Sequence, residues 1–118
     1  MNITELSNLL SGYRIRFDTE QHMQDDIEDI FRRHSVPYVR EFAVGAGAID
    51  FLVGDVGIEC KTKGSPTAVL RQVLRYAEEG AEIASLLLVT SKASHRWQYK
   101  TSLGDKPFRT LWVGAGRL

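Results

Sequence analysis

The chain lacks the means for an internal disulfide and any segment long enough to cross a membrane. Its single cysteine, Cys60, has no partner, which fits a reducing, cytoplasmic compartment. The longest apolar run, residues 84–89, is far shorter than a membrane span and predicts a buried strand. No secretory segment is evident, so we expect no membrane partner.

Zinc-type clusters of ligands are lacking as well. His22, His34 and His95 have no partner cysteines and no ligand-like spacing, so we expect them at the surface or at helix ends. The Gly-Ala-Gly segment at 45–47 has the composition of a phosphate loop, but it precedes a strand and opens no helix. We expect a hairpin turn there.

Neither sign of charge is in excess. The 15 Lys and Arg balance the 15 Asp and Glu, but residues 1–58 carry five basic and ten acidic side chains, and residues 59–118 carry ten and five. A basic second half would attract phosphates with salt-sensitive affinity. Its basic residues include Lys61, Lys63, Arg71, Arg75, Lys92, Arg96, Lys100, Lys106 and Arg109. For those after Arg75, ordinary solubilising charge is an equal alternative.

Hydrophobic periodicity predicts one α/β domain over residues 1–118, with a mixed central sheet flanked by helices. Thr19 or Asp18 would cap the second of three helices, and Ser65 and Pro66 would start the third. The expected helices are residues 4–11, 19–34 and 66–79, and the expected strands are 36–44, 48–53, 58–61, 85–90 and 108–113.

Three charged side chains lie on the two strands of an expected hairpin. Asp50 is on the first strand, and Glu59 and Lys61 are on the second. Side chains alternate along a strand, so Glu59 and Lys61 project from one face while Cys60 enters the core. A turn at residues 54–57 would bring Asp50 near Glu59. Two carboxylates and one ammonium would therefore converge.

This set of groups suits phosphodiester hydrolysis. The reaction needs charge neutralised on the scissile phosphate and a water made nucleophilic, and Mg²⁺ held by carboxylates supplies both. Lys61 would orient the water or hold the phosphate in the transition state. On the three residues alone, a solvated strand face is an equal alternative.

The helix that follows carries Gln72 and Tyr76 four residues apart on one face. With this pair, residues 20–90 resemble the PD-(D/E)XK nuclease superfamily, in the branch of RecB-like and small phage nucleases that has a Gln-x-x-x-Tyr helix after the Glu-x-Lys strand. The chain departs from the family name at Ile49, where Pro would stand. Without the resemblance, the pair would be a Tyr76 ring half-buried on the sheet and a solvated Gln72.

The resemblance implies a restriction-endonuclease-like αβββαβ core and a Mg²⁺ site in which Mn²⁺ can substitute. In that family the helix before the hairpin contributes a carboxylate that assists metal binding. Glu20 is the first candidate for this role and Glu28 the second, and Gln24 would support whichever of them acts. The implied metal ligands are the carboxylates of Asp50, Glu59 and Glu20 and the backbone carbonyl of Cys60. Gln72 and Tyr76 would position phosphates or Lys61.

We therefore expect a divalent-metal-dependent nuclease that acts on DNA, with Asp50, Glu59, Lys61 and Glu20 as its catalytic residues. The residues expected to bind nucleic acid are Lys63, Arg71, Gln72, Arg75 and Tyr76. An inactive nucleic-acid-binding or assembly module is the alternative, and a structural interaction protein comes third. The small size is compatible with a homodimer. The segment 94–99 mixes aromatic and basic residues like a nucleic-acid contact loop, although Trp97 could equally close the edge of the core.

Overall fold

Each helix begins at a residue that caps it. The Asn2 side chain accepts a hydrogen bond from the backbone N–H of Glu5, and the Glu5 carboxylate accepts one in return. Thr19 and Ser65 cap the other two helices in the expected way, and Pro66 is the first residue of the last. The helices are α1 (Ile3–Ser11), α2 (Glu20–Arg33) and α3 (Pro66–Glu79).

The computed structural model describes residues 1–97 and 100–114, and its strands form one mixed sheet with the order β1-β2-β3-β4-β6-β5. The parallel pairs are β3 with β4 and β4 with β6, whereas the other neighbours are antiparallel. The strands are β1 (Val39–Val44), β2 (Gly47–Val53), β3 (Val56–Lys61), β4 (Ser85–Thr90), β5 (Ser102–Leu103) and β6 (Lys106–Trp112), and a short 3₁₀ helix, η1 (Ala93–His95), follows β4.

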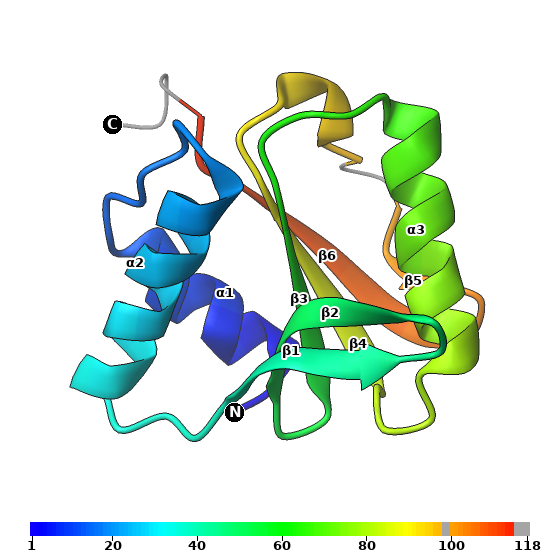
Figure 1. Ribbon diagram of the computed structural model, residues 1–118, viewed down its shortest axis with the longest axis horizontal. Helices are drawn as coiled ribbons and strands as arrows, with labels where there is room; N and C mark the ends of the chain where they lie inside the picture. Colours follow the sequence, from blue (N-terminus) through cyan, green and yellow to red (C-terminus); the bar gives the residue numbers. More distant parts are fainter. Residues whose placement is uncertain (98–99, 115–118) are drawn as a thin grey trace.

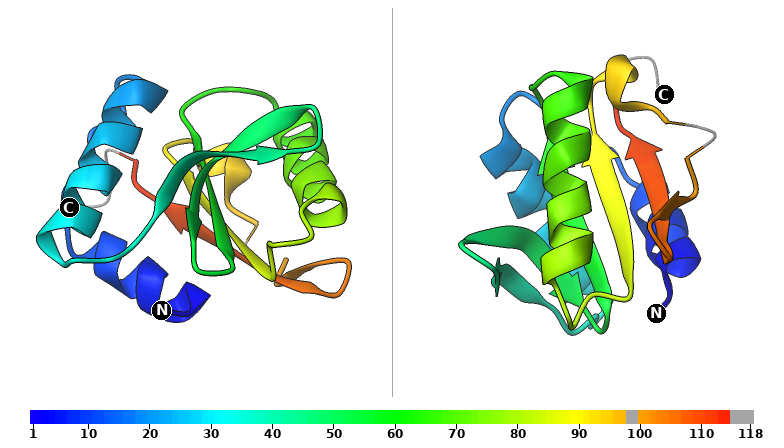
Figure 2. Two further views of the ribbon diagram at one scale, coloured as in Figure 1. Left: turned by 60° about the horizontal axis from the view of Figure 1, so that its bottom comes forward. Right: turned by 90° about the vertical axis from the view of Figure 1, so that its right-hand side faces the viewer.

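Helices cover both faces of the sheet, with α1 and α2 on one side and α3 on the other (Figures 1 and 2). Two apolar clusters result, one under each layer of helices. The central strand β4 is buried along its whole length, as its continuous apolar run requires. The expected α/β fold with a mixed sheet flanked by helices is confirmed, and the elements from α2 to β4 follow the expected order of helix, three strands, helix and strand.

The boundaries differ at a few places. The first strand starts at Val39 instead of residue 36, because Pro37 disfavours regular pairing there. The turn between β2 and β3 occupies only residues 54 and 55, and Gly54 supplies its positive φ of 58°. The last strand begins earlier than expected, at Lys106, and the two-residue β5 was not foreseen. Residues 45–46 form the expected hairpin turn between β1 and β2.

Candidate active site

Asp50 and Glu59 face each other across β2 and β3. Phe51 pairs with Ile58, so the next residues along the two strands, Asp50 and Glu59, lie opposite one another on the same face. The regular pairing ends at this point, although both strands continue. The sequence-based expectation that the hairpin brings these two side chains together agrees with this geometry.

The two carboxylates fill the gap where the strands separate. The Asp50 side chain accepts a hydrogen bond from the backbone N–H of Cys60, with an N–Oδ2 distance of 2.7 Å. The Glu59 side chain accepts one from the N–H of Asp50, at 3.3 Å. Each side chain thus satisfies a backbone donor that would otherwise lose its partner in the ladder. The carbonyl of Cys60 points to the same strand edge as its N–H, so it also faces this gap.

The backbone on the other side of Asp50 is distorted too. Glu41 lies opposite Asp50 in the β1–β2 register, between the pairs made by Arg40 and Phe42. Its φ of +56° is uncommon for a residue with a Cβ atom. Regular pairing is therefore interrupted on both sides of Asp50, a kind of local strain that structures tend to keep at functional positions.

Burial and mutual repulsion disfavour charge on this carboxylate pair. Glu59 is only 4% exposed. Its pKa is raised to about 9, first by burial and then by the charge of Asp50, and Lys61 opposes the shift. The pKa of Asp50 is raised by burial too, against the lowering effect of the Cys60 N–H. Without a further cation the pair therefore holds a proton at neutral pH.

Lys61 is the only cation of the described chain bonded to the pair, and its Nζ lies 3.6 Å from Glu59 Oε2. That distance is long for a charge-assisted hydrogen bond. One ammonium at this distance leaves two close carboxylates incompletely neutralised. The donor set is the kind that Mg²⁺ accepts, because this ion uses one or two carboxylates and keeps several waters.

The three residues of α2 that were proposed for the site make different contacts. Glu20 reaches the rim of the site, where its Oε2 accepts from the backbone N–H of Thr62 at 3.4 Å. Gln24 contacts the site directly, donating from Nε2 to Asp50 Oδ1 at 3.0 Å. Glu28 is engaged elsewhere, by the Tyr38 hydroxyl at 2.9 Å and by Arg40. Of the two helix carboxylates, only Glu20 lies beside the site.

No three His, Cys, Asp or Glu side chains come together as a ready-made metal cage in residues 1–97 and 100–114. Asp50 and Glu59 are brought together, but Glu20 bonds to neither of them. A metal at this pair would therefore complete its shell with the Cys60 carbonyl and water.

Arg40 is a contributor that the sequence analysis missed. Its guanidinium donates to Gln24 Oε1 at 3.1 Å, and Gln24 in turn donates to Asp50. This chain of hydrogen bonds fixes which amide atom of Gln24 points at Asp50. The only signal in the sequence was an arginine on the strand that follows an acidic helix.

The Gln-x-x-x-Tyr pair braces β2. The Gln72 amide donates to the Tyr76 hydroxyl at 2.9 Å, and that hydroxyl donates to the Ala48 carbonyl, also at 2.9 Å. Tyr76 is fully buried instead of half-buried. It therefore anchors the backbone two residues before Asp50. Burial also raises the pKa of its hydroxyl, which remains a donor.

Three basic residues expected to bind nucleic acid are exposed near this brace. Lys63 lies in the loop after β3, and Arg71 and Arg75 lie on α3. The two arginines and Gln72 line a shallow cavity of about 340 Å³. The Arg75 guanidinium lies 5.6 Å from the centre of the Tyr76 ring.

His95 lies at the end of η1, in agreement with the expected helix-end position, but it is fully buried and not at the surface. Its Nε2 lies 2.7 Å from the Gly64 carbonyl, and its Nδ1 lies 2.8 Å from Thr90 Oγ1. A carbonyl can only accept, so Nε2 carries the proton and Nδ1 accepts from the hydroxyl. The ring ties the loop after β3 to the end of β4.

No protein-family model, curated protein or solved structure matches this chain. None of the helices in the described residues is long and apolar enough to cross a membrane.

Proposed function

We propose that the chain is a divalent-metal-dependent nuclease of the PD-(D/E)XK type that hydrolyses phosphodiester bonds in DNA. One observation carries the proposal: the half-buried Asp50 and the buried Glu59 lie face to face, and a single ammonium lies beside them among the described residues. Protein interiors rarely keep such a pair without a partner cation or a function that needs one.

The proposed metal is Mg²⁺, with Mn²⁺ as a substitute. When bound, it would supply charge neutralisation at the scissile phosphate and make a water nucleophilic. The Asp50 and Glu59 carboxylates and the Cys60 carbonyl would hold it. Gln24 keeps Asp50 oriented through its hydrogen bond to Oδ1, and Tyr76 keeps the backbone of β2 in place.

Lys61 would act on the substrate. It follows Glu59 by two residues on the same face, its ammonium lies 3.6 Å from Glu59 Oε2, and its side chain is more exposed than that of Glu59, so a phosphate that arrives from solvent would meet it. There it would hold a phosphate oxygen or orient the attacking water. Glu20 at the rim could accept a hydrogen bond from that water or bind the metal through one.

A nucleic-acid-binding or assembly module without catalysis is the second candidate, and the exposed Arg71 and Arg75 on α3 favour it as much as they favour a nuclease. Cleavage separates the two. We would incubate the purified protein with linear duplex, single-stranded, flap and four-way-junction DNA, and with matched RNA, in Mg²⁺, Mn²⁺ or chelator.

Metal-dependent cleavage that Glu59→Gln abolishes supports the nuclease. Binding of nucleic acid without cleavage of any substrate would contradict the nuclease and support the binding module without catalysis. The same panel would identify the preferred substrate structure, and sedimentation of the protein with and without it would show whether two copies act together.

A further inference from the structure

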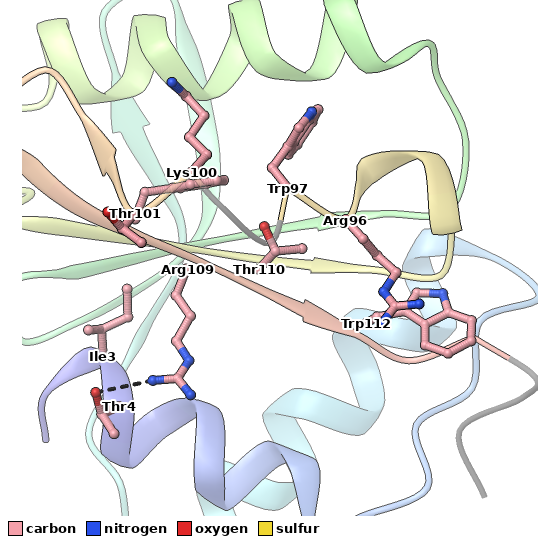
Figure 3. Close-up of a pocket in the computed structure, with 10 residues that line it drawn as sticks. Ile3, Thr4, Arg96, Trp97, Lys100, Thr101, Arg109, Thr110 and Trp112 are labelled. Carbon is pink, nitrogen blue, oxygen red and sulfur yellow. Dashed lines mark hydrogen bonds between the residues drawn. The ribbon is translucent and has the colours of Figure 1, made fainter.

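A second cavity, of about 660 Å³, lies along the outer edge of β6. It is lined by the start of α1, by residues 96–97 and 100–101, and by β6 itself (Figure 3). The volume is within the range of sites that bind small molecules. Among the described residues, β5 pairs with Lys106 and Pro107, and the Thr101 carbonyl accepts a hydrogen bond from the Phe108 N–H. The part of β6 that lines this cavity starts at Phe108 and continues to Trp112.

The lining is cationic. Arg96, Lys100 and Arg109 contribute to it, and none of its ten described residues is acidic. Arg109 donates to the Thr4 hydroxyl at 3.3 Å, and Arg96 lies over the Trp112 ring. None of the three cations forms an ion pair with a carboxylate in residues 1–97 and 100–114. Such a site attracts an anion.

The lining is also aromatic, because both tryptophans of the chain contribute to it. Trp97 stacks on His95 with ring centres 6.0 Å apart and planes at 15°. Trp112 is held by its N–H bond to the Ser91 carbonyl at 3.2 Å and by the Arg96 guanidinium 4.5 Å from its ring centre. Rings fixed in this way offer a π surface at little entropic cost.

A buried hydroxyl in the lining has no partner. Thr110 Oγ1 is enclosed and makes no hydrogen bond in the described structure. Figure 3 places the Thr110 side chain between Trp97 and Arg109. A buried polar atom without a partner is uncommon and costs free energy, so a ligand that supplies an oxygen or nitrogen there would be favoured.

The cavity and the candidate active site lie at the same end of the three parallel strands β3, β4 and β6. Lys61 is in register with Thr90, and Thr90 is in register with Trp112, so the three lie at one level of parallel strands. Two strand spacings of about 4.8 Å place Trp112 about 10 Å from Lys61 along the sheet. A nucleic-acid strand whose phosphate lies at Lys61 could reach the cavity within a few nucleotides.

We propose that this cavity binds unpaired nucleotides of a single nucleic-acid strand. The bases stack on the tryptophan and guanidinium surfaces, and Arg96, Lys100 and Arg109 hold the phosphates. The Thr110 hydroxyl bonds a base or phosphate oxygen. Naming a nucleic acid as the ligand rests on the proposed nuclease function, and the inference adds that the substrate carries an unpaired segment, as a flap or a single strand does.

A second copy of the chain is the other occupant that an open strand edge suggests. The charges argue against it, because two copies would bring the same cations together.

The tryptophans provide the test, because both of them line this cavity and their fluorescence can be excited selectively over that of the tyrosines. We would titrate the parent protein in chelator, where no cleavage occurs, with a short oligothymidylate and with an abasic strand of equal length and phosphate number. We expect the oligothymidylate to quench the fluorescence and bind at least about tenfold more tightly than the abasic strand. Lys100→Glu and Arg109→Glu should each weaken binding about tenfold.

Arg33→Glu, at the end of α2, is the matched control with the same change of charge, and it should bind like the parent. Circular dichroism of each variant would establish that it is folded. Equal binding of the two strands, or unchanged binding by both cavity variants, would overturn the proposal. If the fluorescence changes with the concentration of the protein and not with that of the oligonucleotide, the cavity is occupied by a second copy of the chain. That result would also overturn the proposal.

The two proposals can fail separately. A protein that binds oligothymidylate with quenching but cleaves no substrate would retain this site and lose the nuclease function. A protein that cleaves with Mg²⁺ while its cavity variants bind normally would retain the nuclease function and lose this site.

Discussion

Two acidic regions of this protein lie side by side and are neutralised in opposite ways. Along α2 and β1, Asp25 and Glu28 share the Arg40 guanidinium at 3.0 and 3.1 Å, and Arg32 adds a further contact to Glu28. Between β2 and β3, Asp50 and Glu59 have only Lys61, at 3.6 Å from Glu59. The first region is complete as it stands, whereas the second is short of positive charge.

Gln24 connects the two regions, since it accepts from Arg40 and donates to Asp50. One side chain, that of Gln24, thus separates Arg40 from the Asp50–Glu59 pair. The Gln24 amide orients the Asp50 carboxylate but brings no positive charge to it. The difference indicates that acidic residues alone do not mark a metal site. The metal site proposed above rests instead on a carboxylate pair that the surrounding residues orient but leave underneutralised.

The largest expected effect is a loss of cleavage activity, which substitutions in the Asp50–Glu59 region should cause and those in the Asp25–Glu28 region should not. Asp50→Asn, Glu59→Gln and Lys61→Ala should each lower metal-dependent cleavage by about 10³-fold or more, because each removes a group at the reacting phosphate. Glu28→Gln, in the balanced region, should stay within about tenfold of the parent. Initial rates on the best substrate of the panel would measure this. Wild-type turnover by folded Lys61→Ala would remove that residue from the mechanism.

The next prediction concerns stability and pH in chelator. The pKa of Glu59 is about 9 in the folded protein, above the ordinary value of 4.5. The folded state therefore binds more protons than the unfolded state between these values, and stability falls as pH rises through the interval. The loss approaches about 1.4 kcal/mol per pH unit at most. Below pH 4.5 the contribution is fully present.

Glu59→Gln should flatten this dependence, because the amide cannot ionise. Glu28→Gln should keep it and instead lower the free energy of unfolding by about 1 kcal/mol at every pH, since Arg40 loses one of its charged partners. Urea melts from pH 5 to 9 would compare the three proteins. Parallel curves for the parent and Glu59→Gln would mean that Glu59 titrates normally.

The smallest effects should come from the basic surface of α3. Replacing Lys63, Arg71 or Arg75 singly with Ala should weaken DNA binding several-fold, with little dependence on sequence, and lower the salt slope by about 1. These residues would contact phosphates and carry no information about bases. Titrations at several salt concentrations measure both quantities, and three variants that bind like the parent would place the binding face elsewhere.

The predictions from the sequence that the structure confirms rest on local sequence patterns. Ser65 and Pro66 start α3 because capping is decided within one turn, and Asp50 meets Glu59 because strand alternation and a tight turn leave few other arrangements. The continuous apolar run of β4 was sufficient for the central strand.

Contacts between distant parts of the chain were not predictable in this way. The link from Arg40 through Gln24 to Asp50 joins three elements. The burial of His95 depends on a carbonyl 31 residues earlier. Alternation and helical spacing carry no information about such pairs, and the same holds for the hydrogen bond from Tyr76 to Ala48.

Metal binding measured by calorimetry in buffers of different ionisation enthalpy tests the central claim most directly. If the Asp50–Glu59 pair exchanges its proton for a divalent cation, the parent should bind Mn²⁺ or Mg²⁺ with one site per chain and release about one proton near pH 7.5, because Glu59 must ionise to act as a ligand. Glu28→Gln should behave in the same way, and Glu59→Gln should lose both the binding and the proton release. Absence of binding by the parent, or binding that survives in Glu59→Gln, would contradict the account.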